Sequence, residues 1–308
     1  ALQDKGDFDG ALKLFKECLA IRETTLGRDH PGTASSYASI GAVLEDQGDY
    51  DGALVWLRKC LAIEQTALGA EHPDVASSYS AIGSVMQTKG DYDDALEMLR
   101  KGLAIEVATH GTSHPDVGAS YHSIASVLED KGEFDEALAM HRKSLDIRVA
   151  ALGEEHPSVG TCYNSIGSVL ERKGDYDGAL EYMHKSLEID KVSLGEDHPD
   201  CAVNYNSIGN VLQLKGDYEG ALKNFKRCVK NREVTLGSEH PQTAIAYSCI
   251  GSVLEDMADY TGAIEMFEKC LAIEIKALGP DHPDVAASYS SIGSVLDNQG
   301  DLDGALEM

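Results

Sequence analysis

The stretch LGEDHPD (Leu194–Asp200) gathers three acidic residues and one histidine within seven positions. Side chains of these types could form a metal site or an acid–base pair. The His-Pro pair within it, however, returns every 42 residues along the chain, at His30, His72, His114, His156, His198, His240 and His282. A motif that returns at a fixed step is typical of a repeat protein, so this stretch first indicates a repeated fold.

Two further markers keep the same step. A Gly-acid-aromatic triplet begins at Gly6, Gly48, Gly90, Gly132, Gly174 and Gly216, and it weakens to Ala-Asp-Tyr at Ala258 and Gly-Asp-Leu at Gly300. The segment YNSIG occurs at Tyr163 and Tyr205, with related forms from Tyr37 to Tyr289. We therefore predict one continuous solenoid over residues 1–308, built from about seven units. The units begin near residues 30, 72, 114, 156, 198, 240 and 282, and a repeat is cut at both ends.

Each unit predicts two helices. In the unit that follows His72, apolar residues recur three and four positions apart in two successive segments, which Gly90 separates. This spacing is typical of amphipathic helices, and glycine readily adopts the left-handed backbone that ends a helix. No segment alternates in the manner of a strand. The predicted fold class is all-α, a solenoid of antiparallel helix pairs.

The composition limits the partners and the compartment. There are 52 acidic and 26 basic residues, which gives a formal net charge of −26. Such a surface disfavours nucleic acid and anionic membranes, and no apolar run is long enough to span a bilayer. The seven cysteines lack CxxC spacing, so we expect reduced thiols and a cytoplasmic setting. Four of them share one repeat position, which indicates packing: Cys18, Cys60, Cys228 and Cys270.

The acidic histidine stretch itself does not keep a set of metal ligands. The acid before histidine becomes Ser113 in one unit, and the residue after proline varies among Asp, Gly, Ser and Gln. We find no two histidines within one unit's loop. Because Gly-x-x-His-Pro ends one helix and opens the next, we expect a helix boundary, no metal and no cofactor. No nucleophile, phosphate-binding or metalloprotease motif is present, so we expect no catalytic residues and no enzyme.

At this point the residues resemble a known family. Aromatic-x-x-Ile-Gly-x-x-Leu, followed by Gly-Asp-Tyr and Ala-Leu, is similar to the tetratricopeptide repeat (TPR). The 42-residue unit with its LGxxHP connection resembles the repeats of kinesin light chains. The resemblance implies a right-handed superhelix whose first helices line a concave groove. It also implies a non-catalytic scaffold or adaptor that holds an extended segment of another protein in that groove.

The resemblance also suggests where a peptide would bind. Kinesin light chains place two adjacent asparagines on the groove, and here only the first position matches, at Asn164 and Asn206. The predicted groove residues are Ser80, Ser84, His122, Ser126, Asn164, Ser168, Asn206, Asn210, Gln213, Ser248 and Ser252. Serines line most of this predicted groove, and acidic residues follow one helical turn further along. This combination favours a basic or neutral segment of a partner protein. A competing interpretation is that these residues are only a solvated helix face.

Two further functions are compatible with the sequence. The chain could be the sensor or assembly arm of a larger protein, for example an NTPase, or a structural component of a large complex. Basic pairs recur on the second helices, at Arg58-Lys59, Arg100-Lys101, Arg142-Lys143 and Lys226-Arg227. They could form a contact site on the convex face, although pairing with acids one turn earlier on the same helix explains them.

Overall fold

The computed structural model describes residues 7–308, which form fifteen helices and no strand. The end of a first helix that the repeat predicts before Gly6 lies outside these residues. The first helices of the repeats are α2 (Pro31–Asp46), α4 (Pro73–Lys89), α6 (Pro115–Lys131), α8 (Pro157–Arg172), α10 (Pro199–Lys215), α12 (Pro241–Asp256) and α14 (Pro283–Gln299). The second helices are α1 (Phe8–Thr25), α3 (Tyr50–Leu68), α5 (Tyr92–His110), α7 (Phe134–Leu152), α9 (Tyr176–Ser193), α11 (Tyr218–Thr235), α13 (Tyr260–Leu278) and α15 (Leu302–Glu307).

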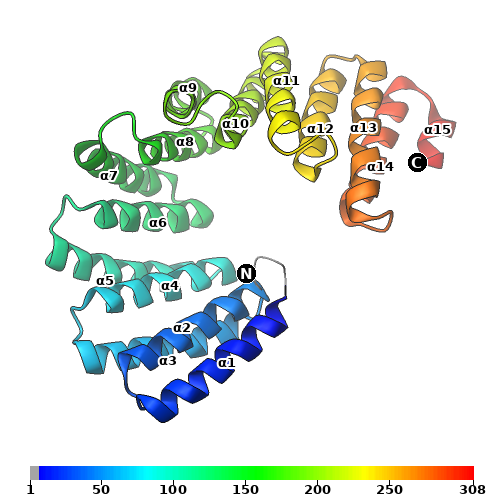
Figure 1. The fold of residues 1–308 in the computed structure, drawn as a ribbon. Helices are drawn as coiled ribbons and strands as arrows, with labels where there is room; N and C mark the ends of the chain where they lie inside the picture. The colour runs from blue at the N-terminus through cyan, green and yellow to red at the C-terminus, as the bar shows by residue number, and fades with distance from the viewer. Residues whose placement is uncertain (1–6) are drawn as a thin grey trace. The chain divides into compact units, whose positions relative to one another are not determined.

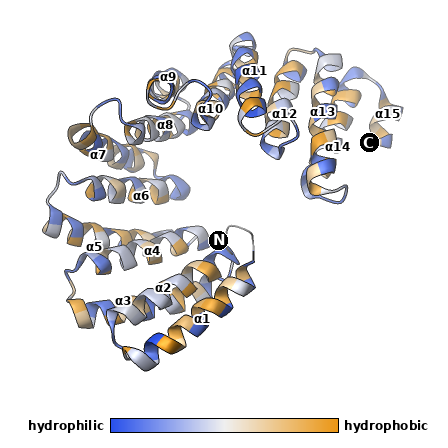
Figure 2. Cartoon of the chain, in the orientation of Figure 1, coloured by the Kyte–Doolittle hydropathy of each residue, from blue (hydrophilic) through white to orange (hydrophobic). Residues whose placement is uncertain are grey.

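The helices group into two compact units, residues 1–153 with α1–α7 and residues 154–308 with α8–α15. Within each unit, consecutive helices pack as neighbours in chain order (Figure 1). Each helix carries both hydrophilic and hydrophobic residues (Figure 2). Among the described residues, no helix is long and apolar enough to cross a membrane. The all-α fold of paired helices is confirmed, while a single continuous solenoid over the whole chain stays a prediction.

The histidine of each His-Pro pair caps a first helix. Its backbone is extended, and its Nδ1 accepts a hydrogen bond from the backbone N–H two residues later. The distances run from 2.9 Å at His30 to 3.3 Å at His198. Proline follows at the first helical position, where it has no N–H to leave unpaired. The acidic histidine stretch is therefore a helix boundary, as predicted, and the imidazole itself acts as the cap that serine or aspartate usually provides.

The packing of the helix pair in five repeats depends on a glycine in the first helix, at Gly41, Gly83, Gly167, Gly209 and Gly251. A Cβ at Gly83 would lie 2.8 Å from Cγ of Leu99, and a Cβ at Gly209 would lie 2.6 Å from the ring of Phe225. The glycines let a large apolar side chain of the second helix lie against the first-helix backbone. This tight contact explains why a residue with poor helix propensity recurs inside each of these helices.

The third repeat solves the same packing problem differently. Ala125 replaces the glycine, and His141 replaces the large apolar residue of the second helix. His141 is 1% exposed and its Nε2 lies 2.5 Å from Oε1 of Glu129, while its ring packs 5.0 Å from that of His122. The Nδ1 atoms of both histidines are buried without a hydrogen-bond partner among the described residues. The methyl of Ala125 fits here because its partner residue has changed too.

The sixth repeat offers a test of backbone strain. Ala258 follows α12 with φ 59°, and it is the one non-glycine residue with a positive φ among residues 7–308. It makes the same turn as Gly216, whose φ is 83°. We expect A258G to stabilise the α12–α13 pair by about 1 kcal/mol, because glycine removes the Cβ strain of the left-handed region. Urea unfolding and hydrogen exchange of the amides in this turn measure the gain. The matched change G216A should cost a similar amount, and a neutral or destabilising A258G would contradict the strain.

The buried histidine pair predicts a pH-dependent stability. Burial, the neighbouring His141 and the charge of Arg148 lower the pKa of His122 from 6.5 to about 4. Above pH 6.5 both the folded and unfolded forms are neutral at this site. As the pH falls towards 4, only the unfolded chain takes up the proton, so folding loses on the order of 2–3 kcal/mol. We expect H122S, which restores the serine of Ser80 and Ser248, to unfold with a weaker pH dependence between 6.5 and 4. Equal pH dependence in the two proteins would contradict this assignment.

Candidate functional site on the first helices

The predicted groove residues all lie on first helices, and their exposure differs little. Ser84 is exposed, and the other ten are half-buried. Ser80 and Ser84 lie on α4, His122 and Ser126 on α6, Asn164 and Ser168 on α8, Asn206, Asn210 and Gln213 on α10, and Ser248 and Ser252 on α12. They therefore occupy three repeat positions, two of which recur on successive first helices within each unit.

Some of these side chains bond one another rather than standing free. Gln213 Nε2 donates to Ser252 Oγ at 3.1 Å and to Oδ2 of Asp256 at 2.7 Å, which ties α10 to α12. Gln87 makes the equivalent pair of bonds from α4 to α6, to Ser126 Oγ at 2.9 Å and to Asp130 Oδ2 at 2.6 Å. The glutamine at this repeat position thus joins one first helix to the next. The sequence pattern assigned Gln213 to a peptide patch, and the structure gives it a structural partner as well.

A hollow of about 570 Å³ lies beside the bonds of Gln213. It is lined by Glu171 of α8, by Asn210, Gln213 and Leu214 of α10 and by Asp256 of α12. Burial raises the pKa of the Glu171 carboxyl. Two predicted residues, Asn210 and Gln213, therefore share a hollow with two acids, which favours hydrogen-bond donors and cations.

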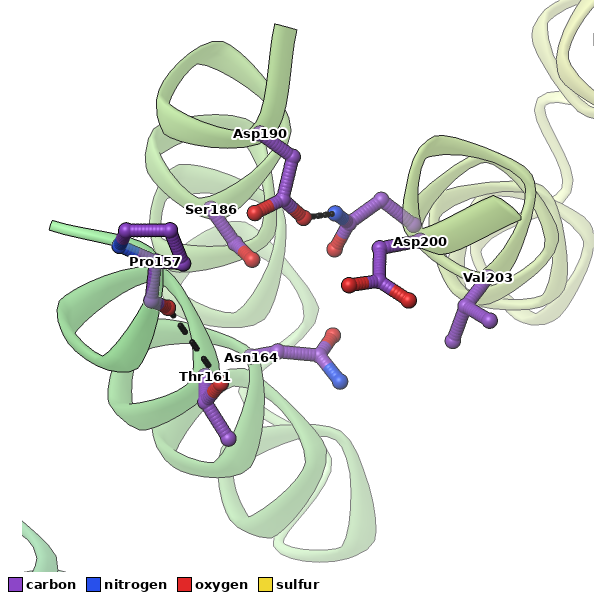
Figure 3. A pocket seen from close by; sticks show the side chains of 8 residues that line it. Pro157, Thr161, Asn164, Ser186, Asp190, Asp200 and Val203 are labelled. Carbon is purple, nitrogen blue, oxygen red and sulfur yellow. Dashed lines mark hydrogen bonds between the residues drawn. The ribbon is translucent and has the colours of Figure 1, made fainter. Parts of the chain in front are cut away.

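Asn164 lies in a second, smaller cavity of about 210 Å³ among α8, α9 and α10 (Figure 3). Its Oδ1 is buried and has no hydrogen-bond partner among the described residues. Asn204, which also lines the cavity, donates from Nδ2 to Asp190 Oδ2 at 2.6 Å. Asp200 points into the space (Figure 3). Asp190 is 6% exposed, and burial is the main cause that raises the pKa of its carboxyl. The cavity thus gathers hydrogen-bond acceptors without a cation of its own on its lining.

The predicted groove residues do not include Asp190 and Asn204, although the repeat carries a signal for them. The same two positions, 14 residues apart on either side of the linker, hold polar partners in other repeats. Glu64 accepts from Ser78, Glu106 from Ser120 and Glu274 from Ser288, each at 2.6 Å. Pairing residues across linkers in register would have revealed these bonds, which join a second helix to the next first helix.

The cysteines confirm their expected role in packing. Cys60 and Cys270 are buried at these same interfaces, each within 3.3 Å of a glutamate oxygen and 3.5 Å of a serine hydroxyl. Burial is the main cause that raises the pKa of both thiols to about 12. All seven cysteines are free thiols. The two protonated thiols act as compact packing groups and not as nucleophiles.

The basic residues of the second helices are engaged within their own repeats. Lys101 Nζ lies 2.6 Å from Glu97 Oε1 one turn earlier, as the intrahelical explanation requires, and 5.9 Å from the ring centre of Tyr79. Lys59 lies 4.4 Å from the ring centre of Trp56, and Lys143 lies 5.1 Å from that of Tyr121. These contacts involve the lysine of three of the basic pairs, and the pairing with an acid one turn earlier is seen at Lys101.

One expectation about the linkers is wrong. The linker between α5 and α6 does bring two histidines together, because His110 ends α5 and His114 caps α6. Their ring centres are 4.5 Å apart, and Asp116 lies beside both. The expectation considered the His-Pro loops without the last residue of the preceding helix, and so it overlooked His110.

Comparison with solved structures identifies the fold. The chain resembles the nearly identical TPR-like repeats of a protein from Podospora anserina described as a kinesin light chain, with 24% identity over 68% of this chain and 99% of that one, at a TM-score of 0.60. It also resembles BtubC (BKLC) from P. vanneervenii, with 19% identity over 77% and 92% of the two chains and a TM-score of 0.63. The apo form of RapI matches at 16% identity over 89% and 94%, with a TM-score of 0.64.

Comparison with curated proteins finds no match. A family profile described as tetratricopeptide repeat matches residues 1–66, 39–106, 116–191, 163–233, 202–257 and 242–308. These matches cover nearly the whole chain and agree with the helix pairs and the 42-residue step. TPR proteins are commonly scaffolds for interactions between proteins and are typically non-catalytic. The chain belongs to the tetratricopeptide repeat family.

Proposed function

We propose that this chain is a non-catalytic adaptor that binds an extended, basic or neutral segment of a partner protein along the first helices of its second unit. The observation that carries the proposal is the cavity around Asn164, where Asn164 Oδ1 is buried without a partner and Asp190 and Asp200 stand opposite. A lysine ammonium or an arginine guanidinium would satisfy these acceptors. Glu171 and Asp256 line the hollow at Asn210, and their carboxyl groups also favour a basic side chain.

The two hollows would bind different parts of the partner segment. The acceptors around Asn164 suit one basic side chain, because the cavity is small and partly closed. The amide of Asn210 can both donate and accept, so it suits the backbone of an extended peptide. Gln213 is already bonded to α12, so we give it the role of holding the helices in register beneath the peptide. The formal charge of −26 would attract a basic segment over longer distances.

The remaining predicted residues belong to the same proposal with smaller roles. Ser168, Asn206, Ser248 and Ser252 would line the path within the second unit, and Ser80, Ser84, His122 and Ser126 would line the equivalent path in the first. The His122 ring already packs against His141, so it would contribute a surface edge rather than a charge. We also propose the cytoplasm as the setting, since all seven cysteines are free thiols. The helix pairs resemble those of kinesin light chain repeats, and this resemblance supports the function of a cargo or partner adaptor rather than that of an arm of a larger enzyme.

Peptide binding tests the proposal. Fluorescence anisotropy against a panel of short peptides of equal length should select basic or neutral sequences over acidic ones. For the best binder, N164A and D200N should each weaken the affinity about tenfold, equal to about 1.4 kcal/mol. Raising the salt from about 0.05 M to about 0.5 M should weaken it further, because the charges of Asp200 and Asp256 are exposed to solvent.

The repeat supplies a matched control. Asp284 occupies the position of Asp200 on α14, next to the equivalent histidine cap. D284N removes the same charge at the same kind of helix start, and we expect it to leave peptide binding unchanged. Selection of acidic peptides, or equal losses from D200N and D284N, would refute a basic site at Asn164. Circular dichroism must show unchanged helix content for each variant.

A further inference from the structure

The linker from α5 to α6 departs from the other six at two positions. Where His110 ends α5, every other linker carries leucine: Leu26, Leu68, Leu152, Leu194, Leu236 and Leu278. Where Ser113 precedes the histidine cap, every other linker carries an acid: Asp29, Glu71, Glu155, Asp197, Glu239 and Asp281. The fold does not require either change, since six copies of the same linker form without them.

The change to histidine completes a cluster of three ligand-bearing side chains. One ligand atom from each of His110, His114 and Asp116 lies within 4.8 Å of the other two. Asp116 Oδ2 lies 3.3 Å from His114 Nδ1 and 3.7 Å from His110 Nδ1. The two imidazole rings lie side by side, with centres 4.5 Å apart and an angle of 38° between their planes. The side chains of His110, His114 and Asp116 are 30%, 42% and 57% exposed, so an ion from solvent could reach them.

Helix capping explains only part of the cluster. His114 Nδ1 accepts the Asp116 backbone N–H at 3.3 Å, as the histidine does in every linker. Asp116 also has equivalents in other repeats, at Asp74, Asp200 and Asp284. His110 has no such equivalent, and the leucines at its position are themselves partly exposed, for example 39% at Leu152 and 36% at Leu194. His110 therefore does not replace a core residue. What it adds to the linker is a ring nitrogen near the possible ligand atoms of His114 and Asp116.

The ligand set and its surroundings suit a divalent transition ion. Two imidazoles and one carboxylate are a common donor set for zinc, with a water in the fourth position. Tetrahedral coordination at about 2.0–2.1 Å brings ligand atoms to about 3.3 Å from one another. Because the lone pair of His114 Nδ1 accepts the helix-cap hydrogen bond, an ion bound at this atom would replace that bond, and the side chains of His110 and Asp116 would rotate towards it. The carboxyl end of α5 favours a cation and the amino end of α6 does not, so the two helix ends largely offset each other.

We propose that His110, His114 and Asp116 bind one divalent transition metal ion, for which Zn²⁺ is the probe, and that the ion ties the end of α5 to the start of α6. The bond would join two successive repeats at one linker. A metal site here differs from the sequence-based expectation of no metal, because that expectation treated all seven linkers as equivalent. The site is independent of the peptide site proposed for the second unit.

The test uses the full chain without an affinity tag and with its thiols kept reduced by a phosphine. Calorimetric titration with ZnCl₂ should give one equivalent bound by the native protein. H110L restores the residue of the other six linkers, so it should fold normally and should lose at least about tenfold in affinity. D116N should lose affinity as well. The reciprocal change L68H places a histidine at the last residue of α3, followed by His72 and Asp74 as at the end of α5, and it should add a second equivalent.

Co²⁺ distinguishes this site from one made by the cysteines. A site of nitrogen and oxygen ligands gives the d–d bands of tetrahedral cobalt without a thiolate-to-metal charge-transfer band. Unchanged Zn²⁺ binding in H110L, a thiolate band in the native protein, or no binding at Zn²⁺ concentrations of about 1 mM would each overturn the proposal. Zn²⁺ should also raise the melting temperature of the native protein and not that of H110L, because an ion that binds the folded form stabilises it.

Discussion

The structure depends on the close approach of the two helices in each repeat. At Gly83 and Gly209 a Cβ would collide with the residue that the second helix presents, a leucine in one case and a phenylalanine in the other. The absence of a side chain on one helix is therefore matched by a large side chain on the other. This contact lets the two helices of a pair approach closely.

Polar contacts then join one repeat to the next. Acid–hydroxyl pairs such as Glu64–Ser78 link a second helix to the following first helix, and glutamines such as Gln213 link successive first helices. Buried or half-buried polar groups of this kind cost free energy unless they are satisfied, so they favour one register of stacking over others. Beside the cavity at Asn164 this pattern continues, with Asn204 as the donor to Asp190, while Asn164 Oδ1 has no partner among the described residues.

In a repeat protein, each repeat can be compared with the others, and the third repeat shows what this comparison reveals. Its core exchanges a glycine and a large apolar residue for Ala125 and His141, and its linker exchanges a leucine for His110. The first exchange keeps the packing and adds a buried polar group. The second adds a ligand to a surface where six other copies have none. Departures of this kind stand out only when the other repeats show what the fold itself requires.

The sequence by itself determined the helix pairs, the 42-residue unit, the TPR family and the helix boundaries at the His-Pro pairs. These depend on local spacing and on residues such as proline and glycine, whose backbone preferences act within a few positions. It also placed the predicted groove residues on successive first helices, and their role in binding stays a prediction. Only the tertiary structure decided which of them are already bonded, that Asp190 and Asn204 face Asn164, and that His110 meets His114. Those contacts join helices through side-chain reach and rotamer, and a pattern along one chain does not contain the distances between atoms of different helices.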